Sequence, residues 1–206
     1  MHGSYYDLGI GTTKSLSYTQ RLVRIQGGLL KKLLSPINPY KWNIRRVCRG
    51  KVLDVGCGIG RNLRYLGGEH NVGVDHNLDS IQICREAGLA AFTPVDFFAT
   101  YGDEKFHTLL LSHVIEHLTP EQAREMLEQY IPYLDNDAQI VIICPQQRGF
   151  ASDDTHVTYF DEQSIRLLLN QLELGKVSYR SFPFPESVGK LFIYNEHVAV
   201  VELTKG

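Results

Sequence analysis

Short apolar runs alternate with amphipathic stretches along the chain from residue 51 onward. Five runs have the length of a strand, at 51–55, 71–74, 90–92, 106–112 and 138–144, and the tail from 176 to 203 reads as two more. Segments with helical spacing lie between them, at 60–65, 80–87, 119–133 and 161–171. The alternation predicts an α/β fold, a mostly parallel sheet of seven strands with helices on both faces. The last two strands have no convincing helix between them, so we expect one strand to be antiparallel.

The first fifty residues form a separate, basic segment. Leu22, Ile25, Leu29 and Leu33 share one face of a helix predicted over 18–34, and the prolines at 36 and 39 are expected to end it. We therefore predict two parts, a helical lid or arm at 1–50 and a catalytic domain at 51–206. A helix lying on a membrane surface is the alternative for the arm.

Charge differs sharply between these two parts. Residues 1–50 carry nine lysines and arginines against one acid, a net charge of +8, and the rest carries twelve against twenty-two, a net charge of −10. Such an arm suits an anionic partner, or it docks on the acidic body of its own chain.

Composition favours a cytoplasmic protein. Hydrophobic residues make up 43% of the chain, enough for a core, but no apolar run approaches the ~20 residues of a membrane span. The N-terminus lacks the basic and apolar regions of a secretory signal. The four cysteines are scattered without a C-x-x-C pair, so we expect neither a disulfide framework nor a cysteine zinc site.

A glycine-rich loop follows the first strand, in the stretch VLDVGCGIGRN at 52–62. The dinucleotide fingerprint G-x-G-x-x-G/A would need glycine or alanine where Arg61 stands, and no Gly-Lys-Ser/Thr of a phosphate loop follows. Asp54, two residues before the first glycine, suits a ligand with a positive group at this end, such as an α-ammonium. The loop therefore predicts a ligand other than a dinucleotide.

The stretch from Asp54 to Gly60 resembles the first motif of the class I S-adenosylmethionine-dependent methyltransferases, an acid followed by G-x-G-x-G after a strand. The resemblance covers about 51–171 and implies a Rossmann-like fold with S-adenosyl-L-methionine as cofactor. In that family the glycine loop approaches the methionine part, an acid after the second strand binds the ribose hydroxyls, and an acid after the third contacts the adenine amine. The cofactor-binding residues that the resemblance implies are Asp54, Gly56, Cys57, Gly58, Gly60, Asp75, His76, Asp96, Phe97, Ser112 and His113.

Within this set, the resemblance gives Asp75 the ribose role, Asp96 the adenine amine and Phe97 a place beside the adenine ring. Ser112 and His113, at the end of the fourth strand, are expected to line the methyl-donor pocket. Asp96 has the alternative of a helix-capping or solvated acid.

The stretch HVIEH at 113–117 contains the H-x-x-E-H pattern of inverted zinc peptidases. That reading needs a regular helix, whereas an apolar strand runs into His113 and a new helix begins at Thr119, with Pro120 at its first position and Gln122 in the capping-box place. The E-H pair instead resembles the ubiquinone-biosynthesis O-methyltransferase type.

A second resemblance is to the small-RNA 3′-end 2′-O-methyltransferases, which hold a divalent metal with E-x-x-E-H and a later histidine. Here His113 stands in place of the first glutamate, and His156 is the later histidine. We do not predict a metal, and a metal-assisted nucleic-acid 2′-O-methyltransferase is kept as the alternative.

The sulfonium methyl is already activated, so the enzyme has to align a nucleophile and exclude water. A hydroxyl acceptor must also lose its proton, and histidine is suited to accept it. We predict His117 and His156 as the catalytic residues; the alternative for each is a structural histidine bonded to backbone. The predicted function is methyl transfer to a small molecule, anionic or carrier-bound, at a hydroxyl. No RNA-binding module is visible, and a cofactor-binding protein without turnover is the non-enzyme alternative.

Overall fold

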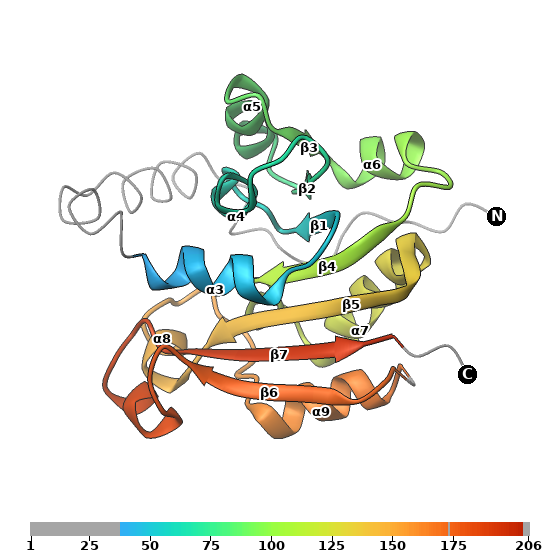
Figure 1. Cartoon of the computed structure of the whole chain (residues 1–206). Helices are drawn as coiled ribbons and strands as arrows, with labels where there is room; N and C mark the ends of the chain where they lie inside the picture. The colour runs from blue at the N-terminus through green and yellow to red at the C-terminus, as the bar shows by residue number, and fades with distance from the viewer. Residues whose placement is uncertain (1–37, 173, 204–206) are drawn as a thin grey trace.

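The computed structural model describes residues 38–172 and 174–203 (Figure 1). A seven-stranded sheet has the order β3-β2-β1-β4-β5-β7-β6. The strands are β1 (Val52–Val55), β2 (Val72–Val74), β3 (Ala90–Phe92), β4 (Phe106–Ser112), β5 (Leu134–Pro145), β6 (Val177–Phe182) and β7 (Glu196–Glu202). β7 pairs antiparallel with β5 and β6, and the other pairs are parallel. The predicted sheet, with its antiparallel strand in the closing pair, is confirmed.

Helices cover both faces of the sheet. The α-helices are α3 (Pro39–Val47), α4 (Arg61–Leu66), α5 (Leu78–Glu86), α6 (Pro94–Thr100), α7 (Pro120–Tyr130), α8 (Gln147–Phe150) and α9 (Glu162–Asn170). Short 3-10 turns are η2 (Ile115–His117), η3 (Ile131–Tyr133) and η4 (Glu186–Lys190). Figure 1 shows α3 in front of the sheet, with α7 and α9 behind it.

Alternation along the central strands divides the core between the two faces. In β4, Leu109 and Leu111 join the large core cluster with residues of α6, α7 and α9, whereas Leu110 packs with Ile44 of α3 on the other face. This is the period of two that side chains follow in a strand. Both faces are therefore apolar, which explains the continuous apolar runs in the sequence.

Three helices begin at a proline, and the sequence interpretation predicted this start for one of them, α7. α7 begins as predicted, with Thr119 and Gln122 forming a capping box. α3 begins at Pro39 behind the N-cap Asn38, and α6 at Pro94 behind the N-cap Thr93. A proline at the first helical position lacks only an N–H that would be unpaired there. Pro39 therefore starts α3, and whether it also ends the helix predicted before it stays a prediction, because that helix lies outside the described residues.

The helix predicted over 18–34 lies outside the described residues, as does most of the predicted arm. Of the arm, the structure describes 38–50, where Ile44 of α3 is buried against Val52 and Leu110 of the sheet. The division at residue 50 stays a prediction. Among the described residues, no helix is both long and apolar enough to cross a membrane.

The order of the strands fixes where a ligand can bind. β1 lies between β2 and β4, so the chain leaves β1 toward one side of the sheet and later returns to its other side. Open sheets of this kind bind ligands beyond the carboxyl ends of the strands at such a point. The segments after β1, β2 and β4 are therefore the place to look for the site.

Candidate functional site

The glycine loop connects β1 to α4 and bends toward β2. Its Gly56 and Cys57 N–H groups both donate to the carbonyl of Val74, at 2.8 and 3.1 Å. Gly56 has φ 76°, and a Cβ there would lie 2.3 Å from Cγ2 of Val114. At Gly56, then, the missing side chain makes room for the segment after β4. The loop and that segment are in direct contact.

Asp75 follows β2 and accepts hydrogen bonds from two backbone groups. The N–H of Gly58 donates to Oδ2 and the N–H of Asn77 donates to Oδ1, each at 2.8 Å. A carboxylate oxygen can accept more than one hydrogen bond, so both oxygens keep capacity for ribose hydroxyls. His76, the neighbouring predicted residue, has Nδ1 3.8 Å from Oδ1 of Asp75.

Asp54 lies fully buried near the end of β1. Burial raises the pKa of its carboxyl to about 7, although the Asn62 amide and Arg61 oppose the shift. The Asn62 amide donates to Oδ1 at 3.5 Å, and no hydrogen-bond partner for Oδ2 is found among the described residues. A buried carboxylate oxygen without a partner is costly, and a positive ligand group would relieve that cost. The residue therefore fits the predicted α-ammonium.

Phe97 is a correction to the predicted adenine site. Its side chain has no exposed surface and packs in the aromatic core, with ring centroids 5.0 Å from Tyr101 and 4.9 Å from Tyr133. The helix α6, which begins at Pro94, turns Phe97 into the core. Asp96, one residue earlier, is exposed and pairs with Nη2 of Arg85 at 3.7 Å. Its predicted contact with the adenine amine stays a prediction.

His113, directly after β4, lies between two acids, Glu196 of β7 and Glu116 of η2. Its Nε2 lies 2.8 Å from Oε1 of Glu196, and its Nδ1 lies 3.3 Å from Oε1 of Glu116. Burial lowers the pKa of His113, but the two glutamates outweigh this and raise it to about 9. The imidazole is therefore positively charged at neutral pH. Ser112, just before it, is buried at the strand end, and the cofactor contacts predicted for both residues stay predictions.

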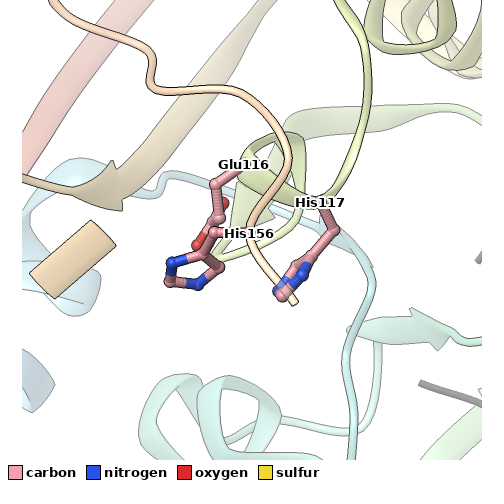
Figure 2. Close-up of side chains that lie close together, drawn as sticks. All are labelled: Glu116, His117 and His156. Carbon is pink, nitrogen blue, oxygen red and sulfur yellow. The ribbon is translucent and has the colours of Figure 1, made fainter. Parts of the chain in front are cut away.

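His117 and His156, the predicted catalytic residues, lie side by side although thirty-nine positions separate them (Figure 2). His117 belongs to η2 after β4, and His156 lies in the segment between α8 and α9; their ring centroids are 4.9 Å apart. The N–H groups of Val157 and Thr158 donate to the carbonyl of Glu116, at 2.7 and 3.1 Å. These backbone bonds hold the two segments together.

The hydrogen bonds of both imidazoles define their tautomer. Nδ1 of His117 lies 3.1 Å from the carbonyl oxygen of Thr155, and Nδ1 of His156 lies 2.7 Å from that of Phe150. A carbonyl oxygen only accepts, so each Nδ1 carries a hydrogen and donates it. In the neutral ring Nε2 then keeps a free lone pair. Both histidines can accept a hydrogen or bind a cation at that atom.

Glu116 completes this cluster, and it was not among the predicted site residues. Its side chain is 1% exposed, and a ligand atom from each of Glu116, His117 and His156 lies within 4.8 Å of the other two. The signal was present in the sequence, because Glu116 stands directly before His117 in HVIEH. Glu196 was also missed, and no local pattern links it to His113, eighty-three residues away.

Comparisons with known proteins give the family and the fold of the chain. The family model described as "Methyltransferase domain" matches residues 28–179. One curated relative, "Probable tRNA methyltransferase 9B" of Homo sapiens, is 30% identical over 73 residues, which are 35% of this chain but only 16% of that protein. The chain therefore matches about a sixth of the length of that relative.

Three solved structures illustrate the likeness in fold. A SAM dependent methyltransferase from Archaeoglobus fulgidus has a TM-score of 0.65 and 22% identity, over 90% of this chain and 99% of that one. The magnesium protoporphyrin IX methyltransferase of Synechocystis PCC 6803 with bound SAH has a TM-score of 0.63 and 14% identity, over 93% of this chain and 96% of that one. The plantazolicin methyltransferase BpumL in complex with SAH has a TM-score of 0.61 and 14% identity, over 94% of each chain.

Proposed function

The chain belongs to the methyltransferase domain family, and we propose that it transfers the methyl group of S-adenosylmethionine to a hydroxyl oxygen of a small-molecule acceptor. That it is a methyltransferase using S-adenosylmethionine follows from the family match over 28–179 and from similar structures that hold SAH. The acceptor and the atom methylated are the proposal.

The residues of this chain fit the cofactor. The glycine loop has no side chain at every second position beside β1. Asp75 keeps acceptor capacity for two hydroxyls, and Asp54 has a buried oxygen that lacks a described partner. When bound, the cofactor supplies a methyl group on a sulfonium, which needs no further activation. The chain then has to orient the acceptor and keep water away.

One observation carries the choice of a hydroxyl. The imidazoles of His117 and His156 both donate through Nδ1 to backbone, so the neutral rings keep the Nε2 lone pair for an acceptor. The turn that carries His117 follows Val114, and Val114 lies against Gly56 of the glycine loop, which supports a role beside the cofactor. A hydroxyl can donate to Nε2, and that contact orients its oxygen for attack and prepares it to lose the proton. We propose that this pair engages the acceptor hydroxyl.

The test uses S-adenosylmethionine with a deuterated methyl group, incubated with a low-molecular-weight cell extract and, separately, with total tRNA. We expect mass spectrometry to find the label on an oxygen of a small molecule, and we expect His117→Asn and His156→Asn to lose it while still binding SAH. His70→Ala, at an exposed histidine outside the site, is the matched control. Label in tRNA alone, or on nitrogen or carbon alone, would overturn the proposal in favour of another acceptor class.

A further inference from the structure

We propose that Cys57 and Cys84 form a site of reversible oxidative modification, at which a peroxide converts the two thiols into a disulfide and so lowers the affinity for S-adenosylmethionine. The inference goes beyond the proposed function, because it concerns the cofactor loop and holds for any acceptor. All four cysteines of the chain are free, so the structure describes the reduced state. Three features of the described residues support the proposal.

The first feature is that the two thiols lie together, although one belongs to the glycine loop and the other to α5. Their Sγ atoms lie 3.6 and 3.3 Å from the same oxygen, the carbonyl of Gly58, and the thiols hydrogen-bond to each other. Both are buried in a small apolar cluster with Leu63 and Ile81. A disulfide needs two cysteines whose side chains point toward each other, and this pair meets that requirement.

The second feature is the space that two glycines leave for the pair. A Cβ at Gly73, in the middle of β2, would lie 2.7 Å from Sγ of Cys57. A Cβ at Gly60, the last glycine of the loop, would lie 2.9 Å from Sγ of Cys84. Both distances are too short for a real side chain, so the absence of one at each glycine lets the two sulfur atoms enter the space between the loop and α5.

The third feature is the unequal acidity of the two thiols. Their mutual hydrogen bond lowers the pKa of Cys84, and nearby Arg64 adds to this against the effect of burial. The same hydrogen bond, together with burial, raises the pKa of Cys57 well above its ordinary value. Because the thiolate is the reactive form, Cys84 is the thiol that reacts first and Cys57 is the one that closes the bond.

The reaction takes place in two steps. In the first, the Cys84 thiolate attacks one oxygen of the peroxide, the O–O bond breaks, and with hydrogen peroxide the other oxygen takes up a proton and leaves as water, so Cys84 becomes a sulfenic acid. In the second, the Cys57 sulfur attacks the sulfur of that sulfenic acid, and the leaving hydroxide takes the Cys57 proton as water. The two thiols lose two electrons in all, and the peroxide gains them.

A disulfide at this site would disturb the cofactor loop. Its sulfur atoms would lie about 2.05 Å apart, so closing the bond draws Cys57 toward α5 and removes both thiol contacts with the Gly58 carbonyl. The N–H of the same Gly58 donates to Oδ2 of Asp75, the proposed ribose ligand. The oxidised chain should therefore bind the cofactor less tightly. Because such coupling is reciprocal, bound SAH should favour the reduced pair.

The test treats the reduced full-length chain with hydrogen peroxide. Mass spectrometry of peptides prepared without reduction should find Cys57 joined to Cys84. Calorimetry should show SAH binding about 10–100-fold weaker, the effect of losing one hydrogen bond to a charged group. Dithiothreitol should restore the affinity, because a disulfide is reversible whereas a sulfinic acid is not. Saturating SAH during the treatment should lower the yield of disulfide.

Two variants separate this pair from the other cysteines. Cys84→Ser cannot form the disulfide and should keep its SAH affinity after peroxide. Cys48→Ser is the matched control, because Cys48 packs in a different apolar cluster, and it should lose affinity as the wild type does. The inference fails if peroxide forms no Cys57–Cys84 disulfide in the wild type, if the disulfide leaves SAH affinity unchanged, or if Cys84→Ser loses affinity equally. None of these measurements involves the acceptor, so the label-transfer experiment tests the proposed function separately.

Discussion

Replacing Asp75 by asparagine tests the cofactor site most directly. The carboxylate is proposed to accept two ribose hydroxyls, and a hydrogen bond to a charged group contributes about 1.5–3 kcal/mol. Asparagine keeps one acceptor oxygen and loses the charge. We therefore expect Asp75→Asn to weaken SAH binding by roughly 3 kcal/mol, or about 100-fold in Kd.

The same substitution also affects the folded protein, and the two effects can be separated. Asp75 accepts from the N–H groups of Gly58 and Asn77, and an amide nitrogen in place of one oxygen would leave one of them unpaired. This should lower the free energy of unfolding by about 1–3 kcal/mol. Urea unfolding of the ligand-free protein measures this loss, and calorimetry well below the unfolding transition measures binding alone.

Asp79→Asn is the matched control, because Asp79 is an exposed aspartate four residues away in the first turn of α5. It should leave both quantities unchanged. Wild-type affinity for SAH in Asp75→Asn would refute the ribose role, and so would equal losses in the two variants.

Two further predictions concern the glycine loop. Gly56→Ala should lower the free energy of unfolding by about 1–3 kcal/mol in urea, because φ is 76° and the new Cβ would meet Val114, and Val114→Ala should restore part of it; equal stability of Gly56→Ala and wild type would contradict this. SAH affinity should rise as pH increases through about 7, because burial raises the pKa of Asp54 to about 7 and only its charged form pairs with an ammonium. Asp54→Asn should lose that dependence, and calorimetry at several pH values should show an unchanged profile if the pairing is wrong.

The sequence predicted those parts of the fold whose signals are local. The strands were visible as apolar runs because both faces of the sheet are covered, and α7 was visible because Thr119 and Gln122 cap it. α6 was missed because its start lies in the segment interpreted as the acid after the third strand. Missing α6 also explains why Phe97 was wrongly placed beside the adenine ring, because the helix that begins at Pro94 turns Phe97 into the core.

The candidate site likewise has parts with a local sequence signal and parts without one. The glycine loop and Asp75 were predicted from motifs a few residues long, and the structure ties them together through the Gly58 N–H. His117 and His156 were each named, but their contact depends on backbone bonds from the 157–158 segment to Glu116. Such bonds leave no periodic trace in the sequence, so the cluster with Glu116 emerges only in three dimensions.

The contact between Val114 and Gly56 has a consequence for the order of events in turnover. It joins the glycine loop, which is proposed to contact the cofactor, to the turn that carries Glu116 and His117, two and three residues after Val114. A displacement that one ligand imposes on its own side could reach the other through this apolar contact. Heterotropic coupling of this kind is reciprocal by thermodynamic necessity, so a methyl donor that sharpens affinity for the acceptor would itself be held more tightly once the acceptor has arrived.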